Sequence, residues 1–327
     1  LLPFLFLLLL IPGAAGAVAL SLPVDCAVGR DCWVGQYVDQ GPGSAMRDHA
    51  CGRRAGDGHQ GTDFNLPDAP AMTAGVPVLA AAPGRVVGVR DGMADRPVHT
   101  ADARQRVRGR ECGNGVRLDH GDGWITQYCH LRRGSVAVQK GQTVERGRRL
   151  GLIGLSGLTE YPHVELVVRH RGRTLDPFTG TPAESDTACG DTAGGLWDAA
   201  ARQRLTYRPV IVPNAGFATD RPAMADARAG AYRTDPAAGS DPPALVFWAE
   251  VFGLMAGDSV RMRLSGPDGK TLAAEQWVPE AGRLQSFRYA GRRRPGAGWT
   301  AGKHKGTLTI RRDGTVLARD ERTVILP

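Results

Sequence analysis

The chain has 327 residues, of which 42% are hydrophobic, and a formal net charge of +8 at pH 7. This length is enough for two ordinary domains, and the 44 glycines, 22 prolines and recurring short Val/Leu-rich segments predict a mainly β fold. The positive charge favours anionic partners, but the arginines are spread along the chain rather than grouped with aromatic residues, so we expect no nucleic-acid partner.

The first 19 residues predict a signal peptide. An apolar run over residues 1–11 is followed by small residues and by an Ala-Val-Ala cleavage site at residues 17–19. The run is about half the length that spans a bilayer, which favours a cleaved leader over a membrane anchor. We therefore expect a periplasmic or secreted protein without a stable membrane anchor.

Six cysteines follow, an even number that indicates disulfides in an exported protein, most simply three. They do not predict a zinc cluster because no Cys-x-x-Cys pair occurs. Their positions are Cys26, Cys32, Cys51, Cys112, Cys129 and Cys189.

The first candidate site residues, His59 and Asp63, follow a cysteine-bearing lead-in over residues 20–58. The alternative for this pair is a turn in which Asp63 binds backbone amides. Residues 76–89 then predict two short strands broken by Pro83-Gly84. Residues 90–113 are polar and arginine-rich, which predicts a long surface loop of the kind that often forms the wall of a binding cleft.

Residues 116–131 predict a hairpin that turns at Gly-Asp-Gly. Pairing of its strands brings Cys112 close to Cys129, and we predict a disulfide between them. Strict alternation would place Tyr128 and His130 on one face and Cys129 on the other. His130 is therefore free for chemistry, although an ordinary half-buried histidine is the alternative. Further short strands are expected over residues 136–144 and 149–154.

His163 and Glu165 lie on one face of the next predicted strand, with Val164, Leu166 and Val168 on the core face. Their Cα atoms should be about 7 Å apart at the usual strand rise. A polar sheet edge, with Glu165 paired to an arginine, is the alternative to a functional site. The domain should close near residue 178.

Residues 179–204 are rich in Thr, Ala, Gly and Asp, and predict a linker with a short helix near residues 196–201. The remainder, residues 205–327, predicts a small immunoglobulin-like β-sandwich in which no residue looks catalytic. Its Trp248, Trp277 and Trp299 are candidates for a binding face, although core packing is commoner.

Six segments together resemble the lysostaphin-type (LytM-domain) zinc endopeptidases, which cut peptide cross-links in bacterial cell walls. They are HQGTDF (residues 59–64), PVLAAAPGRV (77–86), GNGV (113–116), YCHL (128–131), GQTV (141–144) and PHVE (162–165). The resemblance covers roughly residues 56–178 and implies a lysostaphin-like antiparallel β-sheet peptidase domain, to which we assign residues 20–178. It also implies that His59 and Asp63 bind zinc, and that His130 and His163 act on the substrate and the activated water. In the family a third zinc-binding histidine stands where this chain has Glu165.

The chemistry can accommodate this replacement because a carboxylate is a competent zinc ligand. His59, Asp63 and Glu165 could therefore supply the three ligands that a hydrolytic metal needs, while His130 and His163 serve as general base and hydrogen-bond donor. Two carboxylates would make bound water less acidic and favour harder ions such as Mn²⁺ over Zn²⁺. Whether Glu165 is a ligand decides activity.

We therefore expect an exported metalloendopeptidase that hydrolyses peptide bonds in peptidoglycan. The alternative is a catalytically degraded module that binds the cell wall or activates another wall hydrolase.

Overall fold

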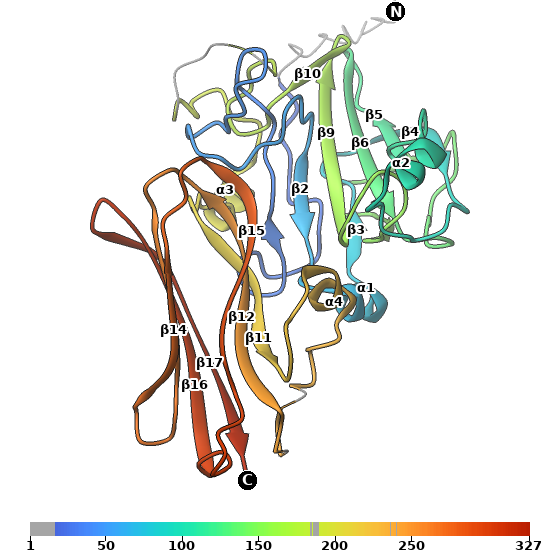
Figure 1. Cartoon of the computed structure of the whole chain (residues 1–327). Helices are drawn as coiled ribbons and strands as arrows, with labels where there is room; N and C mark the ends of the chain where they lie inside the picture. The colour runs from blue at the N-terminus through green and yellow to red at the C-terminus, as the bar shows by residue number, and fades with distance from the viewer. Residues whose placement is uncertain (1–16, 184, 186–189, 236, 240) are drawn as a thin grey trace, which may run out of the picture.

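The computed structural model describes residues 17–183, 185, 190–235, 237–239 and 241–327. The fold is mainly β, as predicted, and its strands form a large sheet in the N-terminal half and two sheets in the C-terminal half (Figure 1). The four helices of the described residues are short: α1 (Ala69–Ala74), α2 (Ala101–Val107), α3 (Ala199–Arg204) and α4 (Met224–Ala229).

An 8-stranded antiparallel sheet organises the N-terminal half. Its order is β1 (Trp33–Val34), β2 (Thr62–Asn65), β9 (His163–His170), β6 (Trp124–Leu131), β5 (Asn114–Asp119), β4 (Gly84–Arg90) and β7 (Thr143–Val144), with β10 (Arg173–Leu175) pairing beside β9. A separate pair joins β3 (Pro77–Leu79) to β8 (Arg149–Leu152). The long strand β9 therefore lies near the centre of the sheet, between β2 and β6.

One face of this sheet packs on the first hydrophobic core. Val164, Leu166 and Val168 of β9 are fully buried there, as their alternation predicts, together with Phe64 of β2. The opposite face keeps its polar side chains, since β-strand residues alternate between faces. The sheet thereby presents the polar residues of β2, β6 and β9 on one side.

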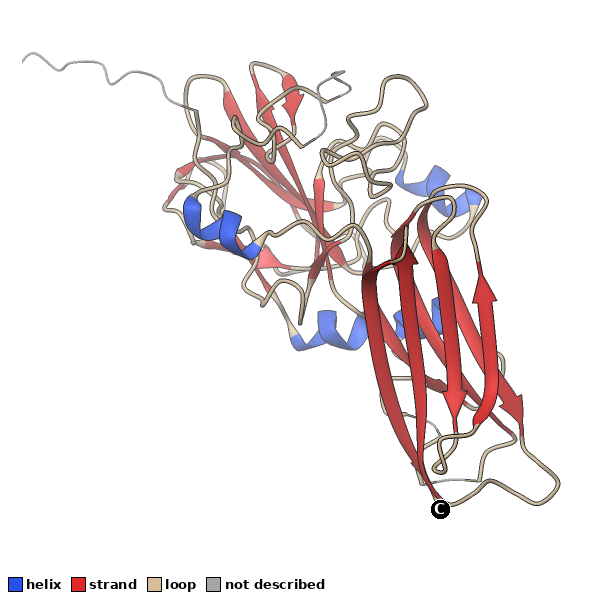
Figure 2. Ribbon diagram, turned by 90° about the vertical axis from the view of Figure 1, so that its left-hand side faces the viewer, coloured by secondary structure: helices blue, strands red, loops and turns tan. Residues whose placement is uncertain are grey.

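The C-terminal half is a two-sheet sandwich, whose strands are seen face-on in Figure 2. One sheet contains β11 (Ile211–Ala218), β12 (Ala244–Leu254) and β15 (Arg283–Arg293), and the other contains β14 (Thr271–Trp277), β13 (Ser259–Ser265), β16 (Gly302–Arg312) and β17 (Thr315–Leu326). In β13, Val260, Met262 and Leu264 point into the core between the sheets while Arg261 and Arg263 are exposed. The immunoglobulin-like type of this sandwich remains a prediction.

Three local predictions differ from the structure. The loop over residues 90–113 contains the helix α2, because the Thr100 hydroxyl accepts a hydrogen bond from the Ala103 amide and caps it. Of residues 136–144, only the last two form a strand. The expected helix near residues 196–201 begins at Ala199, because the Asp198 carboxylate caps it there by accepting from the Ala201 amide.

Part of the predicted linker packs against the first core. Leu196 and Trp197 are buried there, and the amide of Leu20 donates to the carbonyl of Leu196. These contacts tie residues 196–201 to the N-terminal half. The linker and the domain boundaries remain predictions.

Direct contacts hold the two halves together. The Arg54 guanidinium donates to the carbonyl of Arg208, and the Asn214 amide donates to the carbonyl of Pro67. Arg228 of α4 pairs with Glu250 of β12 at 2.9 Å, and its guanidinium lies 4.6 Å from the ring centroid of Tyr161. The sandwich thus contacts the segment that leads into β9.

Two disulfides join described cysteines. Cys112 is bonded to Cys129, which confirms the predicted pair, and Cys26 is bonded to Cys32. A third predicted bridge would need Cys189, which lies outside the described residues. The predicted signal peptide also lies outside them, except for residues 17–19. Within the described part of the chain, no helix has the length and apolarity needed to cross a membrane.

Candidate metal centre and substrate groove

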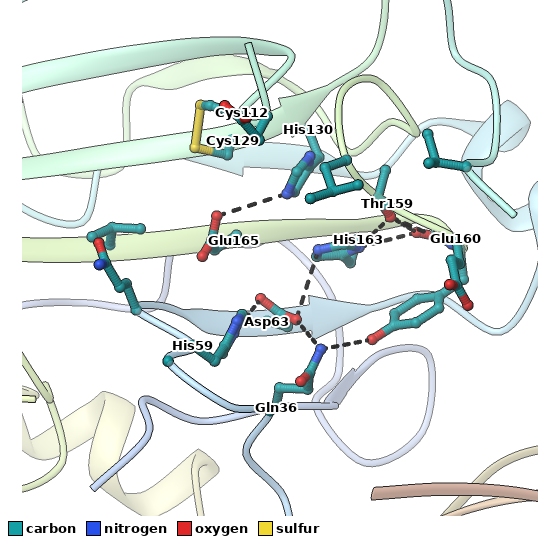
Figure 3. A pocket seen from close by; sticks show the side chains of 18 of the residues that line it. Gln36, His59, Asp63, Cys112, Cys129, His130, Thr159, Glu160, His163 and Glu165 are labelled. Atoms are coloured by element: carbon teal, nitrogen blue, oxygen red, sulfur yellow. Dashed lines mark hydrogen bonds and ion pairs between the residues drawn. A yellow bond between two sulfur atoms is a disulfide. The ribbon is translucent and has the colours of Figure 1, made fainter. Parts of the chain in front are cut away.

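The polar face of the sheet gathers all five predicted site residues into one groove (Figure 3). His163 and Glu165 point into it from β9, as their alternation predicts. Register places Asp63 of β2 directly opposite Glu165. His59 precedes β2, and His130 comes from the end of β6.

His59, Asp63 and Glu165 form the tightest cluster. One ligand atom from each lies within 4.8 Å of the other two. The His59 Nε2 lies 3.1 Å from Oδ1 of Asp63. Gly61 makes room for Glu165, because a Cβ at Gly61 would stand 2.3 Å from the Glu165 Cγ. The turn between His59 and β2 therefore depends on the glycine in this segment.

His130 reaches the groove through an irregularity in β6. Between Tyr128 and Leu131 the strand holds one residue more than its partner β5 does, and His130 has a φ of 63°. Such a bulge interrupts alternation. Tyr128 consequently points into the core, while Cys129 and His130 both line the groove. The prediction that Tyr128 and His130 share a face opposite Cys129 is therefore wrong.

Backbone carbonyls fix the orientation of the two predicted catalytic histidines. The Nδ1 of His130 lies 2.8 Å from the carbonyl oxygen of Ser156, and the Nδ1 of His163 lies 3.0 Å from that of Tyr161. Since a carbonyl oxygen only accepts, each Nδ1 must carry the proton. Each Nε2 is then an acceptor: that of His130 lies 3.7 Å from Glu165, and that of His163 lies 3.7 Å from Asp63.

Burial and mutual charge set the pKa values in the site. Burial opposes the charge of His59, but the Asp63 carboxylate outweighs it and raises the pKa of His59 to about 9. Burial also opposes the charge of Asp63, yet His59 and His163 lower the pKa of this carboxyl to about 2. Burial raises the pKa of Glu165 and lowers the pKa values of His130 and His163. The last two histidines are therefore neutral near pH 7.

The comparisons with known proteins concern this part of the chain. Residues 57–177 match Peptidase family M23. This segment belongs to peptidase family M23. It is similar to the peptidoglycan DD-endopeptidases ShyA and ShyB of Vibrio cholerae, with 37% identity over 115 residues and 30% over 118. These alignments cover 35% and 36% of this chain but 21% and 22% of the relatives, so the chain spans about a fifth of their length.

Among solved structures, the catalytic domain of lysostaphin from Staphylococcus simulans is similar to the M23 segment. It is 22% identical, with a TM-score of 0.29, and the match covers 42% of this chain and 85% of that one.

The donor set of the M23 segment fits a divalent metal. Zinc is held by ring nitrogens and carboxylate oxygens at about 2.0–2.2 Å, which corresponds to ligand atoms roughly 3.4 Å apart in a tetrahedron. The His59–Asp63 contact of 3.1 Å is close to this spacing, and the Glu165 oxygen lies within 4.8 Å of both other ligand atoms. The three side chains are largely buried, with 17%, 1% and 16% of their surface exposed.

Sequence reasoning missed two residues that support this cluster. Gln36, just after β1, donates through its Nε2 to Oδ2 of Asp63 at 3.0 Å and to the Tyr161 hydroxyl at 3.2 Å. Gln36 lies in an irregular segment without a motif, so no local signal could have found it. Tyr161 lies two residues before His163, which is a position that the motif itself could have drawn attention to.

The groove of the M23 segment is completed by parts of the chain outside the sheet. Its volume is about 880 Å³. Residues of the loop over residues 90–113 line one side, which agrees with the predicted cleft wall. The sandwich supplies Phe252, Leu284 and Gln285, although sequence reasoning gave it no part in the site. The ring of Phe252 lies edge-on to Tyr161, with centroids 6.0 Å apart.

Proposed function

We propose that this chain is an exported metalloendopeptidase that hydrolyses peptide bonds in peptidoglycan cross-links. One observation carries the proposal: two neutral histidines and a buried His-Asp-Glu cluster converge in a single groove of an M23 segment. The similarity to ShyA and ShyB, both peptidoglycan DD-endopeptidases, supports the choice of substrate. A periplasmic or secreted location follows from this substrate.

In this proposal His59, Asp63 and Glu165 hold the metal, which is Zn²⁺ or a harder ion such as Mn²⁺. When bound, the ion would activate water and polarise the scissile carbonyl. One histidine and two carboxylates neutralise a divalent ion. With such an ion bound, this balance would acidify water less than a site with a single carboxylate would, which leaves more of the proton transfer to the two remaining histidines.

His130 and His163 share that work through their Nε2 atoms. Both rings are held by Nδ1 hydrogen bonds to carbonyls, and their centroids lie 4.6 Å apart across the groove. Each Nε2 can accept a proton from an attacking water and, once protonated, donate to the oxyanion or to the leaving amine. The lowered pKa values keep both rings ready to accept near neutral pH.

The decisive residue is Glu165, and its variants test the proposal. Wild type, His59→Ala, Glu165→Gln and Glu165→His are incubated with cross-linked peptidoglycan, and metal content is measured on the same samples. Glu145→Gln, an exposed change outside the groove, is the matched control. We expect wild type and the control to bind one metal ion and release peptides. His59→Ala and Glu165→Gln should lose both properties, because each lacks one ligand.

The same experiment distinguishes the alternative. A wild type that binds no metal and releases no peptides, while Glu165→His does both, would mean that the chain is a degraded module that binds the wall or activates another hydrolase. A wild type that binds metal but remains as inactive as His59→Ala would assign the ion a structural role.

A further inference from the structure

Arg169 lines the groove. None of the roles assigned so far, to the metal cluster, to the two histidines or to the residues that support them, involves Arg169. Strand β9 places it on the same face as His163, Glu165 and Val167, all of which line the groove. At the usual strand rise its Cα lies about 13 Å from that of Glu165. The floor of the groove therefore runs from the candidate metal cluster to a guanidinium at its far end.

Neutral groups hold this guanidinium in place. Its Nη2 donates to the Gln60 Oε1 at 3.2 Å, and its Nη1 donates to the Gln127 Oε1 at 3.4 Å. Gln60 follows His59 in the chain, and Gln127 lies on β6 opposite Val167. Two amide oxygens from opposite sides of the groove thus orient the guanidinium without neutralising it.

Arg169 also lacks a carboxylate partner among the described residues. No Asp or Glu oxygen described in the structure comes within 4.0 Å of its nitrogens. Burial lowers the pKa of Arg169, the more distant Glu165 carboxylate opposes this shift, and the positive charge of Arg117 on β5 adds to it. Arg104, elsewhere on the groove wall, is instead paired with Glu160 at 3.1 Å. Arginine is almost never fully buried without a charge partner. Arg169 is half-buried and is held by amide oxygens alone, so its position in the groove points to a site for an anion.

We propose that Arg169 binds a free carboxylate of the peptide substrate, on a residue about four positions from the scissile bond. The inference rests on the proposed peptidase function. An extended peptide advances about 3.3 Å per residue, so these positions span the distance from the cluster to the guanidinium. A planar guanidinium binds a carboxylate through two parallel hydrogen bonds. The preferred substrate is therefore an acidic peptide, and amidation of its carboxylates weakens binding.

Binding and hydrolysis are measured separately to test this. The probes are a fluorescent cross-linked peptide from digested peptidoglycan and the same peptide with its free carboxylates amidated. Fluorescence anisotropy on the chelator-treated protein gives both dissociation constants, and in the absence of metal an acid cannot gain affinity by ligating the ion. Peptide release by the metal-loaded protein is followed in parallel. Arg169→Gln is compared with Arg117→Gln, which changes an exposed arginine outside the groove on β5, the strand beyond β6 in the sheet.

We expect wild type and Arg117→Gln to bind the acidic peptide about 10- to 100-fold more tightly than the amidated one, the usual range for a hydrogen-bonded charge pair. Arg169→Gln should bind both peptides with the affinity that wild type has for the amidated one. Equal affinities in wild type, or a preference that survives in Arg169→Gln, would overturn the assignment. A carboxylate preference without hydrolysis would instead refute the peptidase function and leave the carboxylate site standing.

Discussion

Asp176 is a fully buried carboxyl at the end of the M23 segment, and it should make the protein less stable as pH rises. Its Oδ1 accepts from the Phe178 amide and its Oδ2 accepts from the Gln40 side chain. Burial outweighs both hydrogen bonds and, with the nearby Asp48, raises the pKa of Asp176 to about 7. The native state therefore keeps a proton that the unfolded chain has already released.

The sign and size follow from linkage. Between the unfolded pKa of 3.8 and the folded pKa of about 7, the native state binds more protons, so stability falls as pH rises. Each pKa unit corresponds to about 1.4 kcal/mol. Above pH 8 the raised pKa of Asp176 lowers the free energy of unfolding by about 4 kcal/mol in full, and about 3 kcal/mol of this loss develops between pH 5 and pH 8.5.

The variant Asp176→Asn has the same shape but does not titrate. Urea unfolding of wild type and variant, followed by tryptophan fluorescence, gives the free energy of unfolding at pH 5 and pH 8.5. The difference in the free energy of unfolding between variant and wild type should be about 3 kcal/mol more favourable to the variant at pH 8.5 than at pH 5. Any pH-independent effect of a lost hydrogen bond cancels in this comparison. Parallel pH profiles, differing by less than about 1 kcal/mol, would refute the reasoning.

Three further outcomes concern the groove. Gly61→Ala should displace Glu165 and weaken metal binding at least tenfold, as measured by calorimetry. Gly88→Ala, where an added Cβ meets only ordinary contacts, should bind metal as wild type does. Equal affinities for the two variants would show that Glu165 does not depend on the space at Gly61. Gln36→Leu removes the hydrogen bond to a ligand carboxylate and should weaken metal binding about 10- to 100-fold, with retained affinity as the contrary result. Leu284→Ala should raise KM about threefold at constant kcat, and an unchanged KM would exclude the sandwich from substrate contact.

The sequence by itself predicted the features that depend on short-range periodicity. Alternation in β9 placed Val164 and Leu166 in the core and His163 and Glu165 on the other face, because a strand has a period of two whatever it packs against. The Gly-Asp-Gly turn likewise predicted the hairpin that brings Cys112 to Cys129. A mainly β fold followed from composition and turn residues.

Tertiary structure decided the features that depend on distant contacts. His130 faces the groove because β6 bulges against β5, and the local sequence predicted regular alternation instead. Gln36 meets Tyr161 across a separation of 125 residues, and Leu284 reaches the groove from another sheet. Periodicity carries no information about such meetings, because they arise only when segments far apart in the chain pack together. The sequence therefore supplied the candidate ligands and catalytic groups, and packing supplied the walls and supports of the groove around them.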